Sequence, residues 1–560
     1  MQTSASSRLP HGKSRISLRR LDSSCAIDVD GARTVTVQDR LEEIGYGTYH
    51  YILLAGVGGA LMSESFELGA VAPLHTALAR EFSMSATQRE SLPFLTYLGA
   101  AVGLFVAGPL TDQHGRRRIL LLSLIFITAC MTLTALLPTT IYPSVVMLLR
   151  FCSGLGGAIQ VPAGQALAAE SCCPSARASL FFKIGVMGAF GYFLESFGVK
   201  MFMPHFGEDP ADSWRSLCLV TAASAAAMIP LVLLLDESPS FYAVRGDANS
   251  CVAVLERIAR MNGQPPLQGD VQVDAGAGSS DEPEESDDKS VSLRTCLRSH
   301  WYLVILLAGV DSFRSFFVSG SSYLWKDLFI LAEGSKIEPA MLNMIASVAP
   351  MIGILLCERL LTLGVQNVAI ICAAVTGVAF GALTQPSVCL LSMPLLACVV
   401  TVKLAMAPMG TCVGLIKAET FPTEIRVSAY CIISMFAKVA TILAPTLTEL
   451  LRGGGTAADW SEVELEIYIF GLMIAAFLSG SLLLILPADC GGKGGKLDDF
   501  VVDGRCLRPS RIGKYGTMAN VWEIVRAKED DGSDSDGGLK PCKTEPNLRG
   551  AFLERRVSGK

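Results

Sequence analysis

Eight charged side chains lie inside apolar stretches that are long enough to cross a lipid bilayer. They are Glu64, Glu67, Arg150, Glu195, Asp311, Arg314, Lys403 and Lys438. A charge at the middle of a bilayer costs roughly 2.5–3.5 kcal/mol on insertion scales unless it meets a partner or a wet cavity. Carboxylates in such surroundings can exchange protons, and guanidinium and ammonium groups can bind anions. These residues are therefore candidates for proton transfer and for contact with a small polar solute.

The net charge of this set differs between the two halves of the chain. Three acids and one arginine give −2 in the first half, and one acid with three bases gives +2 in the second. If all eight face one cavity, its field favours an organic anion or a zwitterion, with Arg314 and Lys403 as the carboxylate contacts. Two alternatives remain open. Asp311 can pair with Arg314 one helical turn away, and the long side chain of Lys438 can extend to water.

Twelve apolar runs must position these charges, and each approaches the ~20 residues that a membrane-spanning helix needs. They begin near Tyr51, Ser91, Ile119, Pro143, Ser179, Arg215, Trp301, Ala340, Asn367, Val388, Val427 and Glu464. The chain has 560 residues, of which 51% are hydrophobic and 18% charged, which is too apolar for a soluble enzyme of this size. We therefore expect an all-α membrane protein with two six-helix bundles, at residues 51–235 and 301–487.

Three polar segments flank and separate the bundles. Residues 1–50 are basic and rich in serine, residues 236–300 contain the acidic run D-E-P-E-E-S-D-D, and residues 488–560 are polar. Such compositions cannot bury a core, so we expect an unstructured N-terminal tail, a central linker and a C-terminal tail. Inside the linker, Val252, Leu255 and Ile258 recur at helical spacing, which predicts a short helical stretch after Pro239.

A sequence repeat relates the two bundles. The fourth run ends A-E-S-C-C-P-S-A-R-A-S at residues 169–179, and the tenth ends A-E-T-F-P-T-E-I-R-V-S at residues 418–428. Corresponding positions in two halves are typical of parallel structural repeats. The pairs are Glu170 with Arg177 and Glu419 with Arg426. At a helix end these side chains can pair with neighbouring helices and close one face of the protein, or they can simply be solvated.

A tight basic hairpin joins the second and third runs. Its sequence at residues 108–118 is G-P-L-T-D-Q-H-G-R-R-R, and its three arginines must face water. Further arginines fall in short loops on the same side, whereas the loops after spans three and nine carry no Lys or Arg. Because basic loops stay in the cytosol, this side is predicted to be cytosolic, together with both termini and the linker.

This hairpin resembles the loop signature of the major facilitator superfamily of transporters, with Gln113 where the family usually has a basic residue. The resemblance implies two pseudo-symmetric six-helix bundles that give access to a central site from each side in turn. It also implies a gating role for Gly108, Asp112, Gly115, Arg116 and Arg117.

Two further stretches narrow the resemblance. The sequences L-E-E-I-G-Y-G-T-Y-H-Y at 41–51 and M-S-E-S-F-E-L at 62–68 look like the synaptic vesicle two-related branch. The segment D-E-S-P-S-F-Y-A-V-R-G-D at 236–247 resembles the sugar-porter and organic-ion branches. In related proton-coupled sugar porters an acid of span one and an arginine of span four act together. The resemblance puts Glu64 and Arg150 in these roles, and a permanent structural ion pair is the alternative.

We therefore expect a secondary transporter that moves a small organic anion or zwitterion with a proton, as a symporter. The residues expected to line its solute cavity are Glu67, Glu195, Asp311, Arg314 and Lys403. A neutral sugar transporter, or a receptor or scaffold that binds without translocating, is the alternative. We expect a monomer in the plasma membrane or an intracellular vesicle.

Several other classes of function find no support. The net charge of −6 is spread with mixed signs, which predicts no nucleic-acid partner. We find no nucleophile with a base, no phosphate-binding lysine motif and no metal spacing among six histidines, so we expect no enzyme, cofactor or metal. Most of the 17 cysteines lie in apolar runs. Cys172 and Cys173 fall in a loop, as reduced thiols or as palmitoylation sites.

Overall fold

The computed structural model describes residues 15–21, 24–29, 33–207, 209–265, 272–273, 301–332, 337–389, 391–421, 426–451 and 460–486. Within these residues, twelve helices are long and apolar enough to cross a membrane. This confirms the prediction of an all-α membrane protein. The acidic run of the central linker and the C-terminal tail lie outside the described residues.

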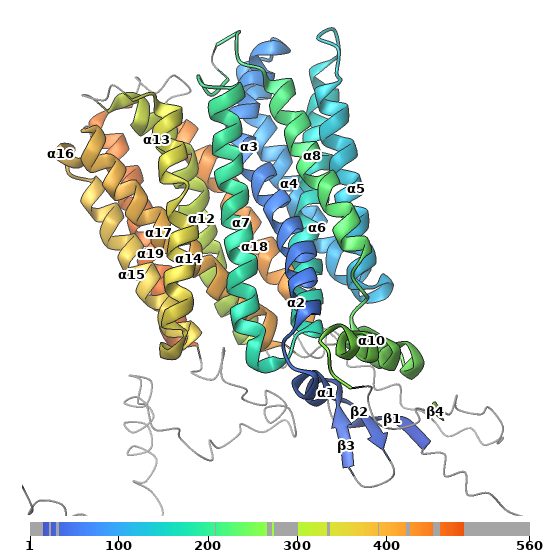
Figure 1. Cartoon of the computed structure of the whole chain (residues 1–560). Helices are drawn as coiled ribbons and strands as arrows, with labels where there is room; N and C mark the ends of the chain where they lie inside the picture. The colour runs from blue at the N-terminus through green and yellow to red at the C-terminus, as the bar shows by residue number, and fades with distance from the viewer. Residues whose placement is uncertain are drawn as a thin grey trace, which may run out of the picture. The chain divides into compact units, whose positions relative to one another are not determined.

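The first half contributes six spans, drawn in blue to green in Figure 1. The first is composite and consists of α2 (Thr48–Leu53), the π-helical turn η1 (Leu54–Gly58) and α3 (Gly59–Glu81). The others are α4 (Ala86–His114), α5 (Arg116–Ala135), α6 (Pro143–Ser171), α7 (Pro174–Phe202) and α8 (Trp214–Leu233). Proline opens α6 and α7, where the missing N–H of the first turn costs nothing.

The second half repeats this pattern in yellow to orange (Figure 1). Its first spans are α12 (Trp301–Leu331), then α13 (Pro339–Ala346) with α14 (Ala349–Arg359) and the turn η2 (Leu360–Leu363), and α15 (Val365–Leu383). After the short α16 (Pro386–Cys389) come α17 (Ser392–Thr420), α18 (Arg426–Leu451) and α19 (Glu462–Ile485).

Glycines let equivalent helices approach closely in both halves. A Cβ added to Gly154 of α6 would lie 1.9 Å from the carbonyl oxygen of Thr96 in α4. In the second half, a Cβ at Gly353 of α14 would lie 1.9 Å from the carbonyl oxygen of Leu404 in α17. Small residues at such crossings replace side-chain packing with backbone contact, which is how helices associate in lipid. Between the halves, α4 packs along α18, and α7 packs against α13 and α14.

Shorter elements gather at the end of the bundles where α4 gives way to α5, which we call the basic end. They are α1 (Val37–Ile44), α9 (Pro239–Val244) and α10 (Ala248–Met261) (Figure 1).

A small sheet has four strands, which are β1 (Arg15–Leu21), β2 (Ser24–Val29), β3 (Arg33–Thr36) and β4 (Gln272–Val273). Their order in the sheet is β3-β2-β1-β4. The pairs β1–β2 and β2–β3 are antiparallel, and β4 runs parallel to β1.

The structure differs from the expected unstructured tail before residue 50. Besides β1 to β3 it has α1, in which Val37, Leu41 and Ile44 share one face and are buried. This helix packs on α7, α9 and α10. Its apolar face spans barely two turns, which is too short for the periodicity to stand out in a polar segment. In α10, Val252, Leu255 and Ile258 are buried as their helical spacing predicts.

Candidate functional site

The turn of the basic hairpin depends on one glycine and one glutamate. Gly115 links α4 to α5 with φ of 99°, a region that residues with a Cβ rarely adopt. A Cβ there would also lie 2.4 Å from Oε2 of Glu237. The Glu237 carboxylate accepts hydrogen bonds from the backbone N–H of Arg116 (2.7 Å) and Arg117 (3.0 Å). It therefore satisfies the first N–H groups of α5, where a negative charge also favours the helix dipole.

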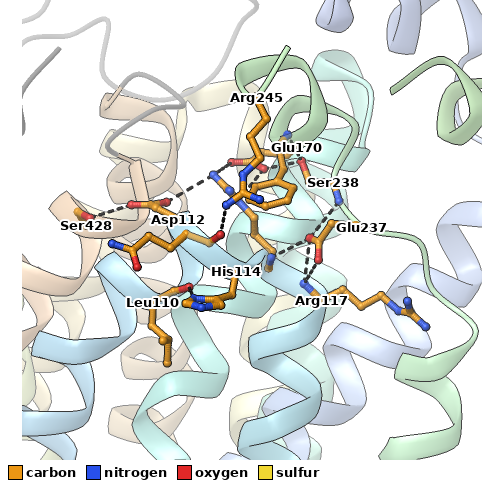
Figure 2. A network of polar contacts seen from close by, with 12 residues as sticks. Leu110, Asp112, His114, Arg117, Glu170, Glu237, Ser238, Arg245 and Ser428 are labelled. Carbon is orange, nitrogen blue, oxygen red and sulfur yellow. Dashed lines mark hydrogen bonds and ion pairs between the residues drawn. The ribbon is translucent and has the colours of Figure 1, made fainter. Parts of the chain in front are cut away.

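Arg116 is the centre of a buried network that Figure 2 shows from close by. Its side chain is 4% exposed, and its Nε lies 3.1 Å from Oε2 of Glu170 in α6. It also lies 3.5 Å from Asp112 in α4, and its guanidinium stacks 5.0 Å from the centre of the Phe241 ring. The Ser238 hydroxyl donates to Glu170 from the start of α9. This network, which we call the gate network, thus joins α4, α5, α6 and α9.

The network reaches the second half of the chain through α18. The Ser428 hydroxyl donates to Oδ2 of Asp112 at 2.8 Å (Figure 2). One turn earlier in α4, a Cβ added to Gly108 would lie only 2.8 Å from Cα of Ser428. A second contact between the halves is the hydrogen bond from Ser179 of α7 to Glu358 of α14, at 2.7 Å. The two bundles therefore touch at the basic end.

The segment after α8 ties α10 to the same network. Asp236 forms an ion pair with Arg257 of α10, with 2.8 Å between Oδ1 and Nη1. Burial is the main influence on this carboxyl and raises its pKa, which Arg257 and Arg117 partly offset. Arg245 stacks on Phe241 and donates to the carbonyl of Gln113 in the hairpin (Figure 2).

The structure brings together most residues that were predicted to form a gate. Gly108, Asp112, Gly115, Arg116 and Glu170 meet there, and the Arg117 side chain donates to carbonyls at the end of α8. Arg177 instead donates to Gln38 of α1 at 2.6 Å. Glu419 is the last residue but one of α17, and the side chain of its expected partner Arg426 lies outside the described residues.

Sequence reasoning missed the partners of these gate residues. They are Glu237, Ser238, Phe241, Arg245 and Ser428. The sequence at 236–247 did contain an indication of this role. Its Ser-Pro pair predicts the start of a new helix, so the glutamate just before that pair lies between two helices and can cap a third one.

The charged side chains of the first half are buried within the spans. Glu64 and Glu67 are one turn apart on α3 and are 6% and 2% exposed. Arg150 of α6 lies within electrostatic range of Glu67 and donates to the Thr134 hydroxyl of α5 at 3.0 Å. Glu64 interacts instead with Lys438 of α18. The charge of Arg150 thus acts mainly on Glu67, and the expected partner Glu64 is influenced by Lys438 instead.

The Glu67 carboxylate is poorly solvated by the protein. Both of its oxygens are buried and accept no hydrogen bond of regular geometry from the part of the chain that the structure describes, and the Ser153 hydroxyl is the nearest donor. A buried carboxylate without donors is costly while it is charged, and Arg150 is its main compensating charge.

In the second half, Asp311 is the centre of a three-residue cluster. It lies 2.7 Å from Nη2 of Arg314, so the local pairing considered for the sequence is present. Its other oxygen lies 2.7 Å from Nζ of Lys417 in α17, which also donates to Ser434 of α18. Lys417 is 3% exposed, and the sequence analysis missed it because it lies close to the end of its span. With Lys417 and the buried Asp327 of α12 included, two acids and four bases give the second half a sum of +2.

A separate chain of polar side chains joins the halves about four turns away along α17. Lys403 of α17 donates to Oδ1 of Asn343 in α13 at 2.9 Å, and Nδ2 of Asn343 donates to Ser196 of α7 at 3.3 Å. The Ser196 hydroxyl also lies 3.1 Å from Oε2 of Glu195. Glu195 and Lys403, which the sequence could only assign to the cavity, are therefore connected across the two bundles.

Two small cavities lie between the halves. One, of about 30 Å³, is lined by residues including His75, Arg89, Tyr323 and Lys326, and the other, of about 10 Å³, includes Gln165 and Tyr430. Such volumes hold a water molecule or two, whereas a site for an organic ligand has roughly 300–1,000 Å³. Neither of these two cavities is large enough to hold an organic solute.

Comparison with known proteins identifies the family. Residues 54–445 match the family model described as Major Facilitator Superfamily. The synaptic vesicle 2-related protein of Rattus norvegicus is 29% identical over 44% of either chain. The niacin transporter NiaP of Acinetobacter baylyi is 23% identical over 41% of this chain and 50% of its own. The chain thus spans about half the length, or less, of these curated relatives.

Solved structures show the same fold. The partially occluded, inward-open xylose transporter XylE of E. coli superposes with a TM-score of 0.59 and 17% identity, over 80% of this chain and 99% of that one. This likeness confirms the arrangement of two six-helix bundles that the sequence predicted.

Proposed function

Because the chain belongs to the major facilitator superfamily, we propose that it is a secondary transporter that moves a small organic anion or zwitterion together with a proton. The observation that carries this proposal is the opposite net charge of the eight span charges selected from the sequence, −2 in the first half and +2 in the second, with Glu195 and Lys403 connected across the interface between the halves. Asp311 engages Arg314 and Lys417, which leaves Lys403 and Lys438 as the cations that face the acidic half.

The names of two relatives agree with this charge pattern. NiaP is named a niacin transporter, and a second relative, from Arabidopsis thaliana, is named organic cation/carnitine transporter 7. Niacin carries a carboxylate, and carnitine is a zwitterion with a carboxylate. A substrate of this kind would place its carboxylate on the cationic second half and the rest of its surface against α3 and α7.

Proton coupling resides in the two acids of α3. Glu64 and Glu67 are one turn apart, and two buried carboxylates at this distance favour holding one proton between them. Arg150 and Lys438 approach this pair from opposite bundles, so relative movement of the bundles changes the charge around the proton. This movement links proton release to exposure of the solute site.

The gate network closes the basic end, which is the cytosolic side in this proposal. The hydrogen bond between Ser428 and Asp112 holds α4 against α18. The ion pair between Arg116 and Glu170 holds the adjoining hairpin against α6. The three arginines of the hairpin favour this orientation, with both termini in the cytosol.

Replacing Gly108 by alanine tests both the gate and the orientation. The added Cβ meets backbone at 2.8 Å, so we expect α4 and α18 to separate at the basic end. The native Cys431 of α18 is buried beside Asp112 and should then react with a membrane-impermeant maleimide. Labelling is followed by peptide mass spectrometry in vesicles of known sidedness. Gly414→Ala is the control, because its Cβ would have ordinary contacts of 3.4 Å or more.

Two results would contradict this part of the proposal. Reaction of Cys431 only from the extracellular side would show that the basic end faces outward, opposite to the orientation proposed. Equal protection of Cys431 in Gly108→Ala and Gly414→Ala would show that this contact does not close the basic end.

The substrate class is tested by competition for uptake into proteoliposomes. We expect carboxylates and amino acids to inhibit, and Lys403→Gln to weaken their inhibition roughly tenfold or more, because a hydrogen bond to a charged group contributes about 1.5–3 kcal/mol. Lys183→Gln is the control, since Lys183 stacks on the Tyr46 ring and is not among the charges that we expect to contact the solute. Inhibition by neutral sugars alone would instead indicate a sugar transporter, and binding without uptake would indicate a receptor.

A further inference from the structure

Three side chains that ligate metals in other proteins meet at the basic end, apart from the gate network. His50 lies in α2, and Cys172 and Cys173 form the connection between α6 and α7. One ligand atom of each residue lies within 4.8 Å of the other two. All three residues are buried, with exposed fractions of 1% or less.

The histidine has one ring nitrogen available. Its Nδ1 accepts a hydrogen bond from the backbone N–H of Gly47 at 3.2 Å. Its Nε2 is buried, makes no hydrogen bond of regular geometry within the described chain, and has the backbone of Ser171 close to the ring. A buried polar atom with so poor a partner is costly, and its position beside two thiols favours a ligand that completes its coordination.

The distances suit a small, thiophilic ion. In a tetrahedral zinc site, with Zn–S near 2.3 Å, two sulfur ligands lie about 3.8 Å apart. The three donor atoms are already within 4.8 Å of one another, so side-chain rotations that bring them about 1 Å closer together would complete the site. Glu42 of α1 lies within electrostatic range of both thiols, and its Oε2 accepts from the N–H of Ser175 at 3.2 Å. Its second oxygen can serve as a fourth ligand or hold a water molecule.

We propose that His50, Cys172 and Cys173 form a binding site for a thiophilic d¹⁰ cation, with Zn²⁺ as the occupant and Cu⁺ as the alternative of the same chemistry. The site fastens the start of the first span to the connection between the fourth and fifth spans. A cation on Nε2 keeps the ring proton on Nδ1, which then no longer accepts from Gly47. Binding is therefore coupled to a local rearrangement at the start of α2.

The proposal is tested with the full-length protein in detergent, stripped of metal by a chelator and then titrated with Zn²⁺ or, under reducing conditions, with Cu⁺. Elemental analysis after desalting should find about one tightly held Zn²⁺ in the parent protein, because the fold already holds the three donor atoms within 4.8 Å of one another. His50→Gln and Cys173→Ser should each lose it. Cys152→Ser should keep it, since Cys152 lies elsewhere in α6.

X-ray absorption then identifies the ligands. Zn–S distances near 2.3 Å together with a Zn–N distance near 2.0 Å support the site, and a shell of oxygen and nitrogen alone overturns it. Retention of Cu⁺ but not of Zn²⁺ assigns the same residues to copper. Binding of neither ion overturns the proposal, as does full retention in His50→Gln and Cys173→Ser.

A second measurement needs no substitution and therefore holds even if the variants fail to fold. Alkylation of Cys172 and Cys173 during mild denaturation, which exposes these buried thiols, is followed by peptide mass spectrometry and should slow at least tenfold when Zn²⁺ is bound, because coordinated thiolates are withdrawn from reaction. Alkylation of Cys152 should be unchanged. Equal alkylation of the pair with and without the metal contradicts the site.

Discussion

Proton-driven accumulation of solute is expected to disappear when Glu67 is replaced by glutamine, while exchange of solute across the membrane continues. Glutamine has the shape of the protonated carboxyl but cannot release a proton, so the cycle can proceed only in its protonated form. With one proton carried per solute, a pH difference of one unit supports about tenfold accumulation, since tenfold corresponds to about 1.4 kcal/mol. Glu67→Gln should reach only the external concentration, as measured with labelled solute in proteoliposomes.

The same assay separates the roles of the two acids on α3. Glu64→Gln should also lose accumulation if the two acids share the proton, because the charge of Lys438 acts on the shared proton through Glu64. Glu466→Gln is the matched control, since Glu466 is exposed on α19. If both Glu64→Gln and Glu67→Gln accumulate solute as the parent protein does, the coupling assignment is wrong.

The partner of Arg150 shows where sequence reasoning reaches its limit. The apolar runs and the cost of buried charge indicate that both Glu64 and Glu67 are functional, but not which of them faces α6. The π-helical turn η1 precedes α3 and places one additional residue in a turn, which rotates the face that each acid presents. Apolar periodicity in a helix buried on all sides does not reveal such a turn.

Local pairs were easier to foresee than distant ones. Asp311 and Arg314 are three residues apart on one helix, and the geometry of a helix brings them together whatever the surrounding fold. Lys417 reaches the same carboxylate from another span, and His50 reaches Cys172 from a third. These contacts depend on how whole helices pack, and one sequence on its own contains no signal of that packing.

The Arg116–Glu170 pair is expected to be the most important single contact for the stability of the basic end. Glu170 is fully buried and Arg116 nearly so, and removal of one partner of a buried ion pair costs about 3–5 kcal/mol. Arg116→Met should therefore lower the free energy of unfolding by this amount, as measured by denaturant titration in micelles. Arg40→Met is the control, because its pair with Glu43 is largely exposed and contributes about 1 kcal/mol or less.

The double variant Arg116→Met/Glu170→Gln shows whether the loss comes from the buried charge. The introduced glutamine is neutral and can still accept from the Ser238 hydroxyl, so this variant should recover a large part of the stability that Arg116→Met loses. If the two substitutions destabilise additively, the pair is not coupled. If Arg116→Met is no more harmful than Arg40→Met, then the caps supplied by Glu237 to α5 are sufficient to hold the hairpin, and the gate depends on Asp112 and Ser428 instead.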